Sequence, residues 1–361
     1  MRGSGYNPLV HKVLPLHPDN FTPPSRTPWG GTRLLARWKH DAVADPGPWQ
    51  GRPLGESWEL SVEPDFPSRV LGRAATLAEV VADDPVWWLG REARAGHRGT
   101  GLLVKLLDSA QALSVQIHPA DDYAGLSPEE SGKPECWYVV EAEAGAGVYL
   151  GLRPEVTDGD LRAALEGGGD VSAMLNFVPC AVGDFFRIDP GTAHAIGPGL
   201  VLVEPQRVIP GRRGLTYRYW DWGRRYAADG RLDPKGAPRA LHVHDALAVT
   251  DWGAPRGEAF VREVLLRAGT AVREGAPRLT PLCGATGGGL PSPALQVARL
   301  TGDGAVSLPD WDALLGITVL EGAVTVDGVT VAAGCTAAVA AGRGETVAQL
   351  GQCHAVLSAV Y

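Results

Sequence analysis

Glycine and proline divide this chain into many short apolar segments, and that division constrains the fold more than any other feature. The 361 residues include 47 Gly and 29 Pro. Several of the apolar runs between them are predicted to be strands bounded by turns: Leu102–Leu107, Trp137–Val140, Val148–Leu150, Phe185–Ile188, Leu200–Val203 and Thr216–Trp220. Many short strands with Gly/Pro turns predict a mainly β fold, either a sandwich or a barrel.

A second set of short apolar runs lies near the C-terminus. Three of them are predicted to form a hairpin series around an Asp327-Gly328 turn: Ile317–Leu320, Ala323–Val326 and Val329–Ala332. Residues 251–295 are rich in Gly, Pro and Arg, and we place a boundary between two β-units there. The predicted division is a first unit with an N-terminal segment over 1–259 and a second β-unit over 260–361.

Helices are predicted to be few and short. Thr76 is a candidate N-cap for a helix beginning at Leu77. Thr157 or Asp158 is a candidate N-cap for a helix over Leu161–Glu166, which three consecutive glycines end.

Charge and composition exclude several classes of protein. The formal net charge is −8 and the sequence pI is near 5.6, without a long basic run, so nucleic acid and anionic membrane are not expected as partners. No stretch of about 18 apolar residues indicates a membrane span, and the N-terminus lacks an apolar signal core. The five cysteines are widely spaced, with no C-x-x-C motif. We therefore expect a soluble cytoplasmic protein with reduced thiols; the sequence does not indicate its oligomeric state.

Gln116 and His118 lie two residues apart in a segment, Leu113–Pro119, where apolar and polar residues alternate. That alternation predicts a strand, and side chains two apart on a strand point to the same face. An amide oxygen and an imidazole directed at one point can begin a metal site. The spacing alone is a weak signal, because Gln and His also occur on ordinary strands.

His194 and Glu135 are the candidates for completing such a site. His194 follows a strand and a Pro190-Gly191 turn, in a segment that resembles the second motif of the cupin family, with Asp189 in that motif's proline position. Glu135 precedes an aromatic strand, where a carboxylate is costly to bury unless it is paired or bound to a metal. These nitrogen and oxygen ligands suit a divalent ion such as zinc. The alternative for His194 is a core histidine bonded to backbone.

A competing metal site is His242-Val243-His244, read as a tighter same-face pair with Asp245 beside it. No separate Glu or His in a turn-strand context supports it. Glu56 and Glu59 are candidates for carboxylates that support a metal site from outside or serve the structure, and we favour the structural role.

Four segments in order resemble the short bacterial form of type I mannose-6-phosphate isomerase, a family of the cupin superfamily: Leu113–Pro119, Gly132–Tyr138, Gly183–His194 and Thr216–Arg224. Trp29–Gly31, Gly55–Glu59 and the β-rich C-terminal region also fit, so the resemblance covers nearly the whole chain. It implies two cupin-type β-sandwich or jelly-roll units with a few short helices. It also implies a zinc-dependent aldose–ketose isomerase with one Zn²⁺ per chain, without metal ligands in the second unit.

The resemblance assigns roles residue by residue. The zinc ligands of the family fall on the positions already chosen on chemical grounds: Gln116, His118, Glu135 and His194. Its essential arginine falls on Arg218, its substrate-side lysines on Lys133 and Lys105, and its phosphate-contacting serine on Ser114. The implied reaction interconverts mannose 6-phosphate and fructose 6-phosphate through an enediol, so a sugar phosphate is the expected small-molecule partner. The proton-transfer base stays open between Lys133 and a water molecule.

Residues 205–215 depart from the family pattern. They are read as a longer loop that carries Arg207, Arg212 and Arg213. A solvated basic loop is the favoured interpretation, and additional capture of phosphate is the alternative.

Two other functions remain open. One is isomerisation of another sugar phosphate or of an unphosphorylated aldose. The other is a non-catalytic cupin that binds sugar or metal, which the cationic side chains of Arg218 and Lys133 argue against.

Overall fold

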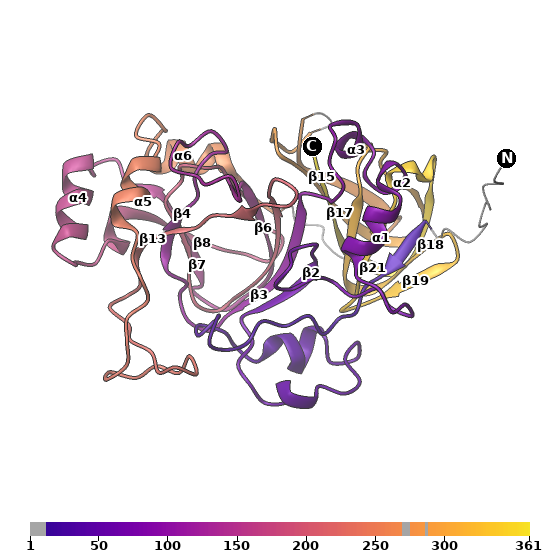
Figure 1. Ribbon diagram of the computed structural model, residues 1–361, viewed down its shortest axis with the longest axis horizontal. Coiled ribbons are helices and arrows are strands. Elements are labelled where there is room, and N and C mark those ends of the chain that lie inside the picture. The colour runs from indigo at the N-terminus through magenta and orange to yellow at the C-terminus, as the bar shows by residue number, and fades with distance from the viewer. Residues whose placement is uncertain (1–11, 269–274, 286–287) are drawn as a thin grey trace.

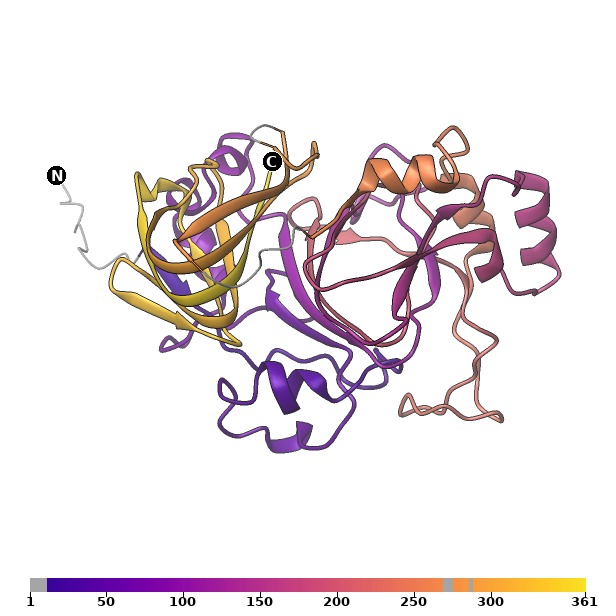
Figure 2. The ribbon, with the colours of Figure 1, turned by 180° about the vertical axis from the view of Figure 1, so that it is seen from behind.

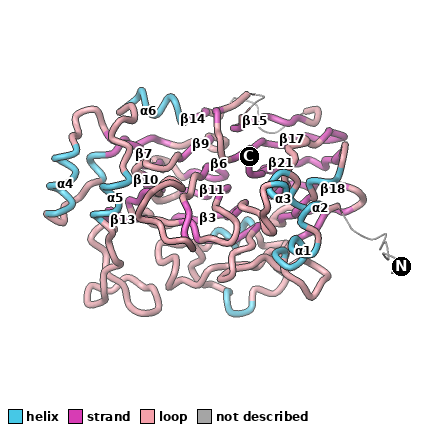
Figure 3. Tube along the Cα trace, turned by 45° about the horizontal axis from the view of Figure 1, so that its top comes forward, coloured by secondary structure: helices cyan, strands magenta, loops and turns pink. Residues whose placement is uncertain are grey.

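The computed structural model describes residues 12–268, 275–285 and 288–361. Figure 1 shows two β-rich units side by side, with part of the N-terminal segment below them. The predicted fold class is confirmed, because the molecule is mainly β, with two β-rich units and a few short helices. Most helices lie at the periphery of the sheets (Figure 3). None of the helices in the described ranges has the length and apolar character of a membrane span.

The first unit is a sandwich of two antiparallel sheets. The six-stranded sheet has the order β14 (Leu265–Leu266), β9 (Phe185–Ile188), β6 (Glu135–Ala142), β11 (Leu200–Arg207), β3 (Leu102–Ser109), β2 (Glu56–Leu60). The five-stranded sheet has the order β13 (Tyr217–Trp220), β4 (Val115–Ile117), β10 (His194–Ile196), β7 (Gly147–Leu152), β8 (Leu175–Pro179). A separate parallel pair joins β12 (Arg213–Gly214) to β5 (Glu130–Ser131). Apolar side chains such as Trp137, Phe186 and Leu202 fill the space inside the sandwich.

The second unit is a single curved sheet of eight strands, seen clearly from behind in Figure 2. Its order is β1 (Val13–Pro15), β20 (Thr336–Val339), β18 (Leu315–Val326), β21 (Val347–Val360), β17 (Leu295–Ser307), β15 (Arg278–Gly284), β16 (Leu290–Pro291), with β19 (Val329–Ala332) paired to β18. Its interior is an apolar cluster of Val, Leu, Ile and Ala.

The six-stranded sheet is buried on both faces. Trp137 points into the sandwich, whereas its neighbour Tyr138 belongs to a different cluster shared with Val297 and Val356 of the second unit. Every residue of β3 is buried. Consequently the second unit covers the outer face of the sheet that carries Glu135.

The N-terminal segment ties the two units together. Val13–Pro15, from the predicted first unit, pairs with β20 of the second sheet. Conversely, Leu265–Leu266, from the predicted second unit, pairs with β9 of the first unit, so one strand on each side crosses the predicted division at 259/260. Buried Lys39 lies 2.7 Å from Glu59 and donates to the Gly334 carbonyl, which gives Glu59 a structural partner.

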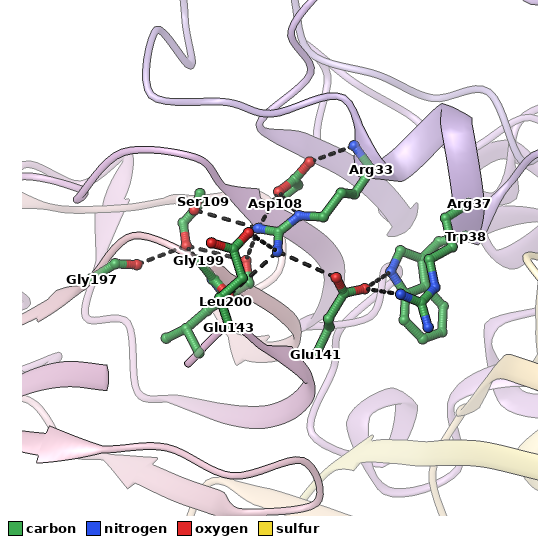
Figure 4. A network of polar contacts seen from close by, with 10 residues as sticks. All are labelled: Arg33, Arg37, Trp38, Asp108, Ser109, Glu141, Glu143, Gly197, Gly199 and Leu200. Carbon is green, nitrogen blue, oxygen red and sulfur yellow. Dashed lines mark hydrogen bonds and ion pairs between the residues drawn. The ribbon is translucent and has the colours of Figure 1, made fainter. Parts of the chain in front are cut away.

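A second tether joins the N-terminal segment to the first unit, as Figure 4 shows. The Arg33 guanidinium lies 2.6 Å from the fully buried Asp108, 3.4 Å from Glu141 and 3.1 Å from Glu143. It also donates to the carbonyl of Leu200. A single arginine thus links the segment to β3, β6 and β11.

The six helices are α1 (Leu77–Asp83), α2 (Pro85–Leu89), α3 (Arg91–Arg94), α4 (Asp158–Glu166), α5 (Val243–Val249) and α6 (Gly257–Val264) in the described residues. Thr76 and Thr157 each form a capping box with the acidic residue three positions later, which confirms both predicted N-caps. Short 3₁₀ or π turns cover Leu34–Trp38, Gly47–Trp49, Ser172–Met174 and Ala341–Arg343.

The predicted C-terminal hairpin is confirmed at its turn, where Asp327 and Gly328 have φ of +52° and +77°. Paired positive φ values match the right-handed twist of the flanking strands. The two runs before the turn are not separate strands, however. They form the continuous strand β18, which register irregularities around Glu321 bend without ending it.

Candidate metal centre

The two sheets of the first unit each carry part of a polar cluster. On the five-stranded sheet, His194 of β10 lies opposite Gln116 of β4, and His118 follows just after β4. On the six-stranded sheet, Glu135 is the first residue of β6. The facing sheets therefore bring together residues that are far apart in the sequence.

The side chains of this cluster are within contact distance. His118 Nε2 lies 3.2 Å from Glu135 Oε2, and His194 Nε2 lies 3.5 Å from Glu135 Oε1. One ligand atom from each of these residues lies within 4.8 Å of the others, and all three are buried. Gln116 Nε2 lies 3.3 Å from His194 Nε2. Because amide N and O are interchangeable by rotation, that position equally suits an oxygen ligand.

Backbone contacts fix the tautomer of both histidines. His118 Nδ1 donates to the Leu215 carbonyl at 3.0 Å, and His194 Nδ1 donates to the Thr192 carbonyl at 2.8 Å. A carbonyl only accepts, so each Nδ1 carries the proton and each Nε2 presents a lone pair. These lone pairs face the oxygens of Glu135.

Facing lone pairs without a shared proton repel one another unless a cation lies between them. Within the described part of the chain, His118 Nε2 and Glu135 Oε1 are buried and have no hydrogen-bond partner. Such orphaned groups are costly unless a ligand satisfies them. The donor set of two imidazoles, one carboxylate and an amide therefore fits a bound divalent metal ion.

The electrostatics favour the protonation states that a metal needs. Burial, reinforced by the charge of Lys133, lowers the pKa of His118 to about 3. Burial likewise lowers the pKa of His194. Burial alone would raise the pKa of Glu135, but Lys133 and His118 outweigh it and hold that pKa well below its usual range. Neutral imidazoles and an ionised carboxylate are the forms that bind metals.

Two predicted lysines lie on the six-stranded side of the cluster. Lys133 Nζ is 3.3 Å from Glu135 Oε2. Lys105 Nζ is 3.7 Å from both Glu56 and Glu204, and it lies over the ring of Trp58. Burial would lower the pKa of Lys105, but the carboxylates of Glu56 and Glu204 outweigh burial and raise it. Both lysines are thus buried cations on this side of the cluster, and Glu56 is a partner of Lys105.

Arg218 and Ser114 belong to the five-stranded side. Arg218 of β13 is the register partner of Gln116, so the two side chains share a face of the sheet. Its Nη1 donates to the Ala240 carbonyl, whereas its Nε is buried and has no partner among the described residues. Burial lowers the pKa of Arg218 to about 10. Ser114 is buried, two residues before Gln116.

The competing histidine pair does not form a site. His242 precedes helix α5, which begins at Val243, so the pair does not share a strand face. The side chain of His244 is 94% exposed, and His242 Nδ1 accepts from the backbone N–H of Arg218. The strand interpretation was wrong because a two-residue spacing is also compatible with a helix start.

The predicted loop over 205–215 is shorter than expected. Strand β11 continues through Arg207, and Arg213 belongs to β12. Arg207 pairs with Asp121 and Arg213 pairs with Glu130, both at 2.8 Å or less. These two arginines therefore have carboxylate partners, which argues against free cations at their positions.

Two residues of β11 were missed by sequence reasoning. Gln206 Nε2 donates to Glu135 at 2.8 Å and to Glu204 at 2.6 Å, and Glu204 also accepts from Trp137. Burial, together with the charge of Glu135, raises the pKa of Glu204 to about 8. Glu204 and Gln206 lie two apart after the apolar run Leu200–Val203, and this polar alternation is the sequence signal that could have identified them.

Comparison with known proteins assigns the chain to a family. The family described as phosphomannose isomerase type I, catalytic domain, matches residues 25–136. Mannose-6-phosphate isomerase of Streptococcus mutans is 33% identical over 232 residues, 63% of this chain and 65% of that protein. A putative mannose-6-phosphate isomerase of Bacillus subtilis is 32% identical over 241 residues, 65% of this chain and 67% of that protein. The chain belongs to the type I mannose-6-phosphate isomerase family.

The match spans 65% of the length of the Streptococcus mutans relative. Solved structures extend the likeness in fold across nearly the whole chain. The mannose 6-phosphate isomerase structure from Bacillus subtilis has a TM-score of 0.72 at 24% identity, covering 96% of this chain and 99% of that one. A mannose 6-phosphate isomerase solved with zinc and yttrium bound has a TM-score of 0.66 at 15% identity, covering 97% and 100%.

Proposed function

We propose that this chain is a metal-dependent isomerase that interconverts mannose 6-phosphate and fructose 6-phosphate. The observation that carries the proposal is the buried cluster of His118, Glu135 and His194, in which His118 Nε2 and Glu135 Oε1 lack hydrogen-bond partners within the described residues. The family of the chain supports the reaction, since its curated relatives are named mannose-6-phosphate isomerases. Buried cations beside the cluster suit an anionic substrate.

We infer that the metal is zinc, one ion per chain, held by Gln116, His118, Glu135 and His194. The mixed nitrogen and oxygen donors support zinc, as does the similar isomerase structure that was solved with zinc and yttrium. Bound zinc would supply Lewis-acid stabilisation of negative charge that develops on the sugar oxygen. Glu135 would be the only anionic ligand, which leaves the site net positive.

The reaction moves a proton from C2 to C1 of the sugar through an enediol. Lys133 is the group proposed to hold an enediol oxygen or to move the proton, directly or through a water molecule, because its Nζ lies beside Glu135. Arg218 is proposed to hold phosphate or an enediol oxygen with its fork of donors. Lys105 and Ser114 are proposed to orient the phosphate end.

A coupled assay for ketose formation tests the proposal. Purified protein is given mannose 6-phosphate or mannose, before and after treatment with a chelator, and again after zinc is restored. We expect turnover of mannose 6-phosphate that the chelator abolishes and zinc restores. Full activity in verified metal-free protein would contradict the proposed site. Turnover of mannose but not of mannose 6-phosphate would show that the substrate is the unphosphorylated sugar. No turnover of either sugar would favour a non-catalytic binding protein.

A further inference from the structure

A cationic cavity lies between the two units, away from the metal cluster's ligands. Its volume is about 380 Å³, and its walls come from β15, β17, the end of β14 and the turn before β9. Figure 3 shows β14 and β9 next to β15 and β17. Its lining includes Arg267, Arg278 and Arg299, with no Asp or Glu among the described residues that form its wall.

The register of the second sheet concentrates polar groups on one face. Thr280 of β15 lies opposite Arg299 of β17, and Arg278 lies opposite Thr301. Residues opposite each other and two apart share a face. The same face carries Val297 and Val356, which pack against the first unit. Arg299 is therefore a charged residue on the face of the second sheet that packs against the first unit.

Arg299 is buried without a counter-charge. It is only 6% exposed, its Nε has no hydrogen-bond partner, and no ion pair to it occurs in the described ranges. The buried hydroxyl of Thr280, directly opposite, is also without a partner there. Two adjacent buried donors left unsatisfied are costly, and a buried charge is costlier still.

Other arginines show how this protein ordinarily satisfies such groups. Arg343, similarly buried in the second unit, donates to the carbonyls of Ala340 and Pro309. Arg267, at the rim of the cavity, pairs with Asp184 and donates to the Pro179 carbonyl. Arg299 differs from both, because no such partner satisfies its guanidinium among the described residues.

We propose that this cavity binds a phosphate group, either as inorganic phosphate or as a small phosphate ester. The planar guanidinium of Arg299 matches the oxygens of a phosphate, and Thr280 adds a neutral donor. Arg278 is exposed and supplies a second cation at the opening. The volume accommodates a phosphate with a small organic group. The site is independent of the isomerase reaction and of the metal ligands.

Ligand-dependent stability tests the cavity. The thermal midpoint of the full-length protein is followed as inorganic phosphate, or glycerol phosphate, replaces chloride at constant ionic strength. A saturable rise is expected, because a ligand that binds only the folded state stabilises it. The ligand with the lower dissociation constant identifies the source of the phosphate group. No rise beyond that in chloride, with either ligand, would overturn the proposal.

Variants assign the effect to the cavity. Arg299→Met is expected to weaken phosphate binding about tenfold or more, and Thr280→Val several-fold, as charge-assisted and neutral hydrogen bonds are lost. Exposed Arg262→Met, outside the cavity, is the matched control and keeps the rise. Arg218→Met is also expected to keep the phosphate-dependent rise in thermal midpoint. If Arg218→Met lost this rise while Arg299→Met kept it, phosphate would be binding at the isomerase site, and the proposal would be overturned. If Arg299→Met fails to fold, Thr280→Val decides alone.

Discussion

The two β-units share an architecture but differ in what their interiors contain. Inside the first unit, His118, Glu135 and His194 meet at one point, with Lys133 beside them. Inside the second unit, the core is an apolar cluster. Both units therefore enclose an interior, and in the first unit a few polar side chains at strand ends make that interior a candidate metal site.

The second unit supports the first from outside. Its contact surface includes His354, which bonds the hydroxyl of Tyr138 on β6. Tyr138 is three residues from Glu135 on the same strand. We interpret the second unit as a structural support that keeps β6 buried on both faces.

The largest expected effect is the difference between removing a histidine of the first unit and removing one of the second. His118→Ala should lose the bound metal and lower activity about a thousandfold, since several kcal/mol of charge stabilisation disappear. His354→Ala, the histidine of the second unit, should keep its metal. Metal analysis and the coupled assay measure both. If His354→Ala lost the metal and His118→Ala kept it, the metal site would belong to the second unit, contrary to the account.

A substitution that creates a cavity in the core of the second unit should lower stability without changing metal content or turnover. Leu357→Ala removes a fully buried side chain and should lower the free energy of unfolding by about 2–5 kcal/mol. The folded variant should keep its metal and its turnover. Denaturant titration and metal analysis on the same preparation provide the measurement, and loss of metal from folded protein would show that the second unit does more than support.

Arg218→Ala should affect chemistry without the metal. The arginine lies beside the proposed ligand Gln116 in register but is not a proposed ligand itself. Activity should fall about a hundredfold with unchanged metal content, as when a positioned donor to developing charge is lost. Exposed Arg262→Ala is the matched control. An equal loss of metal would indicate that Arg218 only maintains the structure of the site.

Two buried carboxyls of the molecule contrast in pKa. Glu135, beside Lys133, has a pKa held well below its usual range, whereas burial raises the pKa of Glu92 to about 7 despite hydrogen bonds from Gly101 and Thr100. A raised folded-state pKa means that stability is full below the unfolded pKa and declines as pH rises toward 7.

Glu92→Gln should therefore remove a pH dependence. The wild type should lose on the order of 1–3 kcal/mol between about pH 4.5 and 7, and the variant should lose less. Thermal midpoints across that range measure the difference, with exposed Glu258→Gln as the control. Parallel curves for wild type and Glu92→Gln would show that this carboxyl titrates normally.

Local patterns made much of the fold predictable. Gly and Pro bounded the strands, and the Thr76 and Thr157 caps needed only residues within one helical turn. For the site, the spacing of Gln116 and His118 on a strand and the turn before His194 named residues that the structure brings together. Those signals lie within a few residues of each other.

What sequence reasoning missed depends on register between distant strands. Gln206 reaches Glu135 across a separation of 71 residues, and nothing near either residue specifies that pairing. Arg299 is similar, because its position opposite Thr280 and Val356 depends on pairing between strands that its own neighbours do not specify. Helix α5 was missed for a different reason, since the two-residue spacing of His242 and His244 does not distinguish a strand from a helix start.

The central claim is that the first unit holds a metal ion on nitrogen and oxygen ligands. X-ray absorption at the zinc K-edge of protein loaded with one equivalent of zinc tests it directly. The account predicts a shell of nitrogen and oxygen at about 2.0–2.2 Å with two imidazoles and no sulfur. Zinc–sulfur scattering at about 2.3 Å, from any of the five cysteines, or failure of the protein to retain zinc, would contradict it.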